Sequence, residues 1–345
     1  MAFFTACHKD PAVSDGDKDT DVGTDSGSGI RKSYVNPISS QSLPDPTVIR
    51  GEDGKFYLYA TEDIRNIPIM TSNNLMTWIQ SGTVFTESTR PGIVKGEMLW
   101  APDIAKVDGK YVLYYSFVPS DFTDPASQYN WGIGAAVADK PSGPWVGKGK
   151  VFNGEDVGVR CSIDPFFYED GGKNYMVWGS YNGLWAIELS DDGLSIKDGA
   201  QKTRLVGLDG YGIEGSVIHK KDGYYYFFAS QGGSGYYDDY KVGVVRSENL
   251  LGPYYNKEGQ NATTGASLTM ILKSSYDFQS PGHCSGIVTD DEGTDWLLYH
   301  AYVKGSPDGG RRLMLDKITW GADGWPVINK GKGPIKSSTE VPQFN

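Results

Sequence analysis

Three carboxylates and one histidine occupy corresponding places in a phrase that occurs five times along the chain. They are Asp45, Asp164, Glu214 and His283, and the remaining copy carries Ala101. Each phrase continues with a short apolar stretch, a polar turn and an aromatic stretch, as in DPTVIRGEDGKFYLYAT from position 45. An aspartate before proline can simply cap a turn. Gathering several carboxylates costs stability through mutual repulsion, so their recurrence at equivalent places indicates acid–base chemistry.

The repeat also predicts the fold that must position these residues. The five phrases begin 50 to 69 residues apart and combine aromatic stretches with Gly and Asp turns. Repeats of this kind are typical of β-propellers with four strands per blade. Further alternating stretches at 69–78, 134–145, 184–195 and 242–254 supply the later strands. We therefore predict an all-β, five-bladed β-propeller over residues 32–345, with four-stranded blades and the active site in the central funnel.

The composition agrees with a strand-rich globular domain. Of 345 residues, 45 are Gly, 22 Tyr, 13 Phe and 9 Trp. The net charge of −11 argues against a nucleic-acid groove, and no apolar run reaches the roughly 20 residues of a membrane span. The three cysteines, Cys7, Cys161 and Cys284, lack zinc-ligand spacing and cannot all be paired, so we expect free thiols. We also expect a monomer.

The first 31 residues have a different character. They include PAVSDGDKDTDVGTDSGSG, a low-complexity run that is too polar to form a core, so we predict a disordered tether. The preceding Phe-Phe-Thr-Ala-Cys is similar to the end of a bacterial lipoprotein signal. Cys7 would then be a lipid anchor on an exported protein at the cell surface or in the periplasm. An ordinary frayed terminus is the alternative.

The order of the blades separates the carboxylates into two groups. Blades three and four are neighbours, so Asp164 and Glu214 should lie side by side, whereas Asp45 faces them across the channel. A carboxylate beside another one suits a proton donor, and an isolated carboxylate suits a general base. This layout predicts an inverting glycosidase, whose two carboxyl groups stand roughly 6.5–9.5 Å apart. Ala101 leaves room in the channel, and Trp100 offers a flat face to a sugar.

Four motifs resemble family 43 of the glycoside hydrolases. They are Leu-Pro-Asp-Pro at 43–46, Trp-Ala-Pro-Asp-Ile at 100–104, Ile-Asp-Pro at 163–165 and Ile-Glu-Gly at 213–215. The resemblance spans about residues 38–335 and implies a five-bladed propeller that hydrolyses arabinofuranosides or xylosides with inversion. It implies that Asp45 is the general base, that Glu214 is the general acid, and that Asp164 orients Glu214 and tunes its acidity.

Later segments are most similar to the α-1,5-L-arabinanases of this family. These segments are YKVGVVRSENLLGPY (240–254), SPGHCSG (280–286) and DWLLYHAY (295–302). The similarity implies endo-acting cleavage of plant cell-wall arabinan and a calcium ion in the central channel near His283, with His300 a weaker candidate. A histidine that is hydrogen-bonded without metal is the alternative. Gly215 and Ser216 depart from the Ala-Pro that commonly follows the acid in arabinanases.

Other activities of the same family are the main alternatives. An exo-acting α-L-arabinofuranosidase or β-xylosidase would differ mainly in its loops, which decide whether the cleft is open at both ends. Arg311 resembles an arginine that some exo-acting relatives direct at the substrate, although the adjacent Arg312 could take that place. Tyr181 is expected to line the pocket. A non-catalytic carbohydrate-binding propeller is a more remote alternative, which would not need all three carboxylates.

Overall fold

The computed structural model describes residues 33–209 and 212–345. The predicted tether over residues 1–31, with Cys7, lies outside the described residues and stays a prediction. Within the described ranges no helix is long and apolar enough to cross a membrane. The helical segments described are one short α-helix and four 3₁₀ turns: α1 (Gly154–Val157), η1 (Pro125–Tyr129), η2 (Ala262–Thr264), η3 (Pro307–Gly309) and η4 (Asn329–Gly331).

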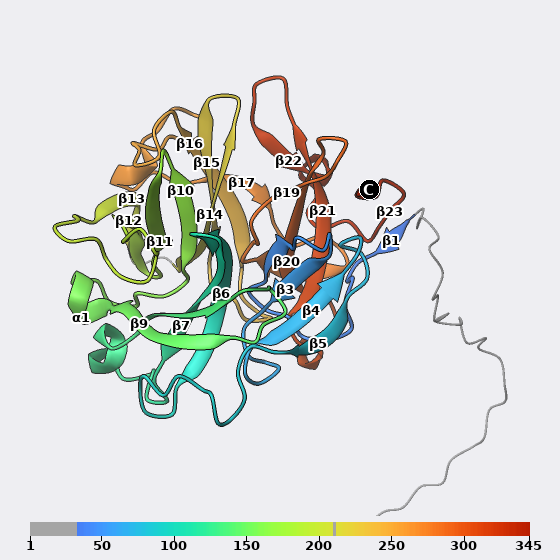
Figure 1. Ribbon diagram of the computed structural model, residues 1–345. Coiled ribbons are helices and arrows are strands. Elements are labelled where there is room, and N and C mark those ends of the chain that lie inside the picture. The colour runs from blue at the N-terminus through green and yellow to red at the C-terminus, as the bar shows by residue number, and fades with distance from the viewer. Residues whose placement is uncertain (1–32, 210–211) are drawn as a thin grey trace, which may run out of the picture. The chain divides into compact units, whose positions relative to one another are not determined.

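Five antiparallel sheets form the blades of a propeller, as predicted (Figure 1). Blade I contains β2 (Thr47–Arg50), β3 (Phe56–Tyr59), β4 (Pro68–Ser72) and β5 (Ile79–Thr83). Blade II contains β6 (Met98–Val107), β7 (Lys110–Val118), β8 (Gly132–Ala138) and β9 (Val146–Asn153). Blade III contains β10 (Phe166–Asp170), β11 (Lys173–Trp178), β12 (Asn182–Glu188) and β13 (Thr203–Asp209). Blade IV contains β14 (Ile213–Lys221), β15 (Tyr224–Gln231), β16 (Lys241–Ser247) and β17 (Thr269–Leu272).

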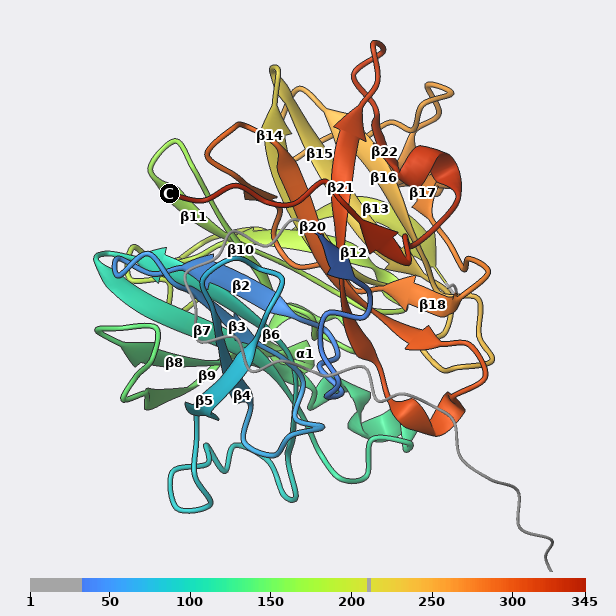
Figure 2. The ribbon, with the colours of Figure 1, turned by 90° about the vertical axis from the view of Figure 1, so that its right-hand side faces the viewer.

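Blade V differs from the others because its innermost strand is interrupted. It contains β18 (Phe278–Gly282), β19 (Val288–Thr289), β20 (Asp295–Val303), β21 (Arg312–Trp320) and β22 (Pro326–Ile328). Both β18 and β19 pair with β20, and the gap between them contains His283. Figure 2 shows blade V in orange and red beside blade IV.

A short two-stranded sheet closes the ring. It pairs β1 (Tyr34–Val35) with β23 (Ser337–Ser338), so segments from both ends of the described propeller meet. The side chain of Asn36 then exchanges two hydrogen bonds with the main chain of Leu315 in β21, at 2.9 and 3.0 Å. These contacts tie blade I, which begins directly afterwards, to blade V.

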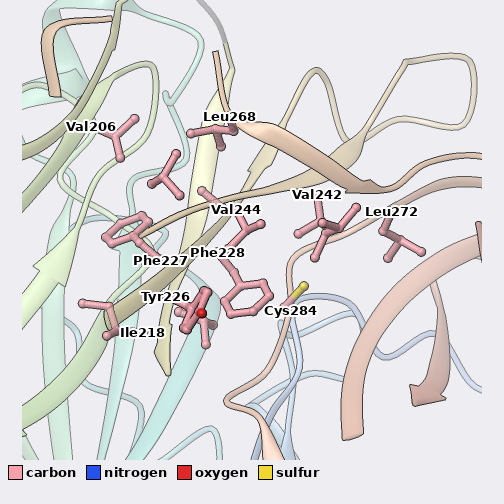
Figure 3. Close-up of a cluster of buried hydrophobic side chains, with 14 of the residues drawn as sticks. Val206, Ile218, Tyr226, Phe227, Phe228, Val242, Val244, Leu268, Leu272 and Cys284 are labelled. Atoms are coloured by element: carbon pink, nitrogen blue, oxygen red, sulfur yellow. The ribbon is translucent and has the colours of Figure 1, made fainter. Parts of the chain in front are cut away.

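The blades are held together by apolar side chains packed between their faces. The largest cluster joins blades III, IV and V, and Figure 3 shows part of it around Phe227 and Phe228 of β15. Val242, Val244 and Val245 of β16 are all fully buried in the same cluster, as expected for a strand that is covered on both faces. Cys284 is buried there as a free thiol, and Cys161 is also free, as predicted.

Candidate active site

The backbone at the start of each blade contains one residue in the left-handed conformation. Asp45, Ala101, Asp164 and His283 all adopt left-handed conformations, with φ between 36° and 59°. In blade IV the left-handed residue is Gly215 (φ 62°), so Glu214 precedes the equivalent position by one residue. The sequence alignment, which placed Glu214 itself at that position, is therefore wrong by one residue.

The exception in blade IV has a steric reason. A Cβ atom on residue 215 would lie 3.1 Å from the ring of His283, closer than side-chain atoms ordinarily approach. Glycine accepts both the left-handed backbone and the close neighbour. Gly215, part of the departure Gly215-Ser216 noted in the sequence, therefore allows blade IV to pack closely on His283 of blade V.

At the level of these residues, a polar side chain connects each blade except blade III to the next. These side chains come from the second strand of a blade or directly follow it, and each accepts a hydrogen bond from the main-chain N–H that begins the following blade. The acceptors are Thr61 for Ala101 (2.7 Å), Ser116 for Asp164 (2.9 Å), Ser230 for His283 (2.7 Å) and His300 Nδ1 for Asp45 (3.1 Å). Ser180 breaks the pattern, because its hydroxyl donates to Glu214 Oε2 instead (2.8 Å).

Asp45 lies in a positively charged environment. Its Oδ1 accepts a hydrogen bond from Arg311 Nη1 at 2.8 Å, and its Oδ2 accepts one from the Thr61 hydroxyl at 2.6 Å. Burial by itself would raise the pKa of this carboxyl, but the Arg311 guanidinium, helped by the Thr61 hydroxyl, holds the pKa of Asp45 well below its usual value. Asp45 is therefore ionised at neutral pH. The main chain of Arg311 is bound to Leu43 and Ser42, which fixes the two side chains together.

His300 binds the main chain of Asp45 as a neutral imidazole. Burial lowers the pKa of His300 well below its usual value, and its Nδ1 accepts the Asp45 N–H, which leaves the proton on Nε2. That nitrogen finds no hydrogen-bond partner among the described residues. The ring stacks on Tyr240, with centroids 5.7 Å apart and planes inclined by 7°.

Asp164 and Glu214 lie side by side, as the blade order predicted. One ligand atom each of Asp164, Glu214 and His283 lie within 4.8 Å of one another. Burial first, and the negative charges of Glu214 and Asp45 next, raise the pKa of Asp164 well above its usual value. The Tyr240 hydroxyl donates to Glu214 Oε1 at 2.8 Å, so with Ser180 both oxygens of Glu214 are hydrogen-bonded. Asp164 thus retains a proton that Asp45 does not.

All seven residues predicted for the site line one cavity of about 450 Å³. They are Asp45, Trp100, Asp164, Tyr181, Glu214, His283 and Arg311. Arg311, not Arg312, points into it, which settles the register left open by the sequence. Tyr181 is half exposed, and the negative charge of Glu214, followed by burial, raises the pKa of Tyr181 to about 12.

Several lining residues were not identified from the sequence. Phe122 and Trp131 both pack edge-on against Trp100, with ring centroids 5.7 and 6.2 Å apart. They flank η1, in a loop that carries no repeat signal. Thr61 could have been identified from the sequence. The aromatic stretch of its phrase ends in a small polar residue, and so do the aromatic stretches of three other phrases.

The cavity continues beyond the carboxylates. A second hollow of about 670 Å³ shares Phe122, Trp131 and Tyr181 with the first and extends to Arg160 and Asn182. Together the two hollows form an aromatic-lined trough over blades II and III. An aromatic trough with a few polar groups suits a chain of sugar units, because sugar rings combine apolar faces with hydroxyl edges.

The donor set also fits a divalent cation. Two carboxylates and one imidazole converge at Asp164, Glu214 and His283. Calcium prefers oxygen ligands and completes its shell with water, so three protein donors suffice only if water supplies the rest. Because both oxygens of Glu214 already accept hydrogen bonds, Asp164 and His283 offer the freer ligand atoms.

Comparisons with known proteins show the family to which the chain belongs. The family model "Glycosyl hydrolases family 43" matches residues 34–326. The chain is 29% identical to a probable arabinan endo-1,5-alpha-L-arabinosidase A of Aspergillus clavatus, over 87% of this chain and 96% of that protein. It is 27% identical to the extracellular endo-alpha-(1->5)-L-arabinanase 2 of Bacillus subtilis, over 88% of this chain and 73% of that protein.

A solved structure shows the same fold. It is an alpha-L-arabinanase of Cellvibrio cellulosa complexed with arabinohexaose, with a TM-score of 0.72 and 27% identity over 85% of this chain and 97% of that one. The family model covers most of the described propeller, and the motifs on which the resemblance was based all lie within it. The chain is therefore a glycoside hydrolase that belongs to family 43 of the glycosyl hydrolases.

Proposed function

We propose that this enzyme hydrolyses the α-1,5-L-arabinofuranosidic linkages of arabinan within the chain and with inversion of the anomeric centre. The observation that carries the proposal is that an ionised Asp45 lines one cavity with the adjacent carboxyl groups of Asp164 and Glu214, of which Asp164 has a raised pKa. Similarity to proteins named arabinanases supports the substrate.

The two sides of the cavity provide both proton transfers of the reaction. Asp45, ionised, accepts a proton from a water molecule whose oxygen forms the new bond to the anomeric carbon. Glu214 gives its proton to the glycosidic oxygen as the old carbon–oxygen bond breaks. Ser180 and Tyr240 then stabilise the resulting carboxylate through their hydroxyl groups. Asp164 keeps the proton of the pair available to Glu214 between turnovers.

The trough supports action on a polymer. A pocket for one terminal sugar would end at the carboxylates, whereas here the cavity continues past Trp131 and Tyr181 toward Arg160. Several consecutive sugar units would fit such a trough. Trp100 and Tyr181 would contact the units at the bond that is cleaved, and Arg311 would both bind substrate and hold Asp45.

We also propose that a calcium ion binds near His283, with water molecules in the remaining positions. A bound cation would supply positive charge beneath the carboxylates. Addition of calcium to chelator-treated enzyme should raise its melting temperature, and His283→Ala should remove that shift. An unchanged melting temperature in the native sequence would contradict the proposal.

The place of action is proposed to be outside the cell. Similarity to an extracellular arabinanase supports export, and the substrate would be a plant cell-wall polysaccharide. The lipid anchor at Cys7 stays a prediction, which mass spectrometry of the protein isolated from its native membrane fraction would test.

Product profiling tests the activity itself. Debranched arabinan, branched arabinan, xylo-oligosaccharides and aryl glycosides are incubated with enzyme, and products are separated over time. A ladder of arabino-oligosaccharides from debranched arabinan is expected. NMR spectra recorded at early times should show that the first anomer released has the configuration opposite to that of the cleaved linkage, which is inversion. Release of monosaccharide alone would show exo action, and cleavage of xylo-oligosaccharides alone would overturn the proposed substrate.

A further inference from the structure

A third hollow of about 440 Å³ lies on blades IV and V and shares no lining residue with the catalytic cavity. We call it the distal pocket; it is lined by Tyr224, Arg246, Ser247, Glu248, Asn249, Pro253, Tyr255, Asn256, Lys257, Gly259 and Trp325. Its lining residues come from β15, from the end of β16 and the segment after it, and from Trp325 just before β22; Figure 2 shows β22 beside β17.

Strand register places the distal pocket at the far end of blade IV. Glu214 pairs with Ser230 at the catalytic end of the β14–β15 ladder, and Lys221 pairs with Tyr224 at the other end. Tyr225 in turn pairs with Ser247, the last residue of β16. A ligand in the distal pocket would therefore not reach the catalytic carboxylates.

Tyr255 presents an aromatic ring on a fixed backbone. Its main chain exchanges two hydrogen bonds of 2.9 Å with Arg246, and it also bridges to Asn261. The side chain is 40% exposed, which is unusual for a tyrosine held so firmly. Within the described chain its hydroxyl has no hydrogen-bond partner, so both the ring and the hydroxyl are free to meet a ligand.

Arg246 is fixed in the floor of the distal pocket. Its guanidinium lies 4.3 Å from the ring centroid of Tyr224 and 4.7 Å from that of Trp325. Nη1 donates to the Tyr226 hydroxyl and to the Asp323 carbonyl, both at 3.3 Å. Nε and Nη2 have no acceptor among the described residues, so a rigid fork of donors remains for adjacent oxygen atoms of a ligand.

The other polar groups favour a neutral ligand. Glu248 and the side-chain amide of Asn249 have no partners in the described structure and can bind hydroxyl groups. Lys257 is already paired with Asp323 at 2.6 Å. The carboxylate of Glu248 balances Arg246, so the distal pocket carries no strong excess charge that would select an anion. Aromatic faces beside hydroxyl-binding groups match the chemistry of a neutral saccharide.

We propose that the distal pocket binds a segment of a neutral pentose polysaccharide without cleaving it. The inference rests on the proposed function for the identity of that polysaccharide, which is arabinan. Binding at two separate places on one polymer raises the effective concentration of cleavable chain at the trough. Activity on long arabinan, but not on short oligosaccharides, therefore depends on the distal pocket.

Affinity gel electrophoresis tests binding directly. The full chain carrying Glu214→Gln, which should bind without cutting, is run in native gels containing debranched arabinan or another neutral polysaccharide. Adding Tyr255→Ala should lower the apparent affinity roughly three- to tenfold, because one stacking ring is lost. Tyr255→Phe keeps the ring and should be retarded like the parent, as should Tyr276→Ala, a matched control at a tyrosine that is 92% exposed outside the pocket.

Measurements of hydrolysis rates distinguish a failure of this inference from a failure of the proposed function. In the native background, Tyr255→Ala should reduce the rate on long arabinan at low concentration and leave the rate on arabinotetraose unchanged. Equal retardation of Tyr255→Ala and its parent, or no retardation of the parent by any polysaccharide, would overturn the distal site. If the native enzyme fails to cleave arabinan but Tyr255→Ala weakens retardation by another neutral polysaccharide, the distal site stands and the proposed substrate falls.

Discussion

Asp45 and Asp164 are alike in almost everything except their neighbours. Both begin a blade, both adopt left-handed backbones (φ 52° and 59°), and both are 6% exposed. Burial raises the pKa of each, yet the final shifts have opposite signs. Arg311 from blade V lies beside Asp45, whereas Glu214 from blade IV lies beside Asp164. The repeat therefore provides equal burial, and one neighbouring side chain decides whether the carboxyl holds a proton.

The largest effect should come from removing the base. Asp45→Asn should lower kcat by about 10⁴-fold on every substrate, because water must be activated whatever the leaving group. Rates on debranched arabinan and on an aryl arabinofuranoside with a good leaving group check this. A much smaller loss on the aryl substrate would contradict the role of Asp45. A retained melting transition is the control for folding, since Arg311 loses its partner.

Glu214→Gln should have the next largest effect, and its size should depend on the substrate. On arabinan kcat should fall by about 10³-fold, because the glycosidic oxygen must leave without a proton. A dinitrophenyl arabinofuranoside needs little protonation and should lose far less. Equal losses on both substrates would contradict the assignment of Glu214 as the acid and would remove the contrast with Asp45.

Asp164→Asn should lower kcat by roughly ten- to a hundredfold and change the pH profile. Repulsion between the two carboxyl groups raises the pH at which the pair loses its last proton, and a neutral amide at position 164 should remove that effect. The basic limb of kcat/KM should move down by about one pH unit. Asp63→Asn alters a carboxylate of the same cavity outside the pair and should leave that limb in place. An unmoved basic limb in Asp164→Asn would contradict the coupling.

Arg311→Met should have the smallest effect on rate, about tenfold at the optimum, and should move the opposite limb. Without the guanidinium, burial would raise the pKa of Asp45, so the base would be protonated at higher pH. The acid limb of kcat/KM should then rise by one unit or more. Arg312→Met is the matched control, because this neighbour makes no contact with Asp45 in the described structure. Movement of the acid limb in both variants would contradict the assignment.

Much of this site followed from the sequence because it lies on repeated elements. The heads of the blades could be aligned, so the adjacency of Asp164 and Glu214 was predicted and is found, and Asp45 lines the same cavity. The error was one residue in blade IV, where Gly215 takes the left-handed position. Sequence similarity between copies does not show which residue adopts that backbone when glycine follows the carboxylate.

The walls of the cavity were less predictable. Phe122 and Trp131 lie in a loop between β7 and β8, outside the repeat, and reach the site only because they pack on Trp100. Loop conformation depends on such contacts more than on local sequence. The distal pocket is similar, since it joins the end of blade IV to Trp325, a residue of blade V.

The sequence by itself determined the number of blades, the class of chemistry and the three carboxylates. Each of these follows from residue types that recur at recognisable intervals along the chain. Only the tertiary structure showed which side chain keeps Asp45 ionised. Arg311 and Asp45 are 266 positions apart, and their 2.8 Å contact exists because blade V closes onto blade I. Charge interactions fall with distance in space and not along the chain, so the same aspartate can acquire either pKa shift depending on which blade lies beside it.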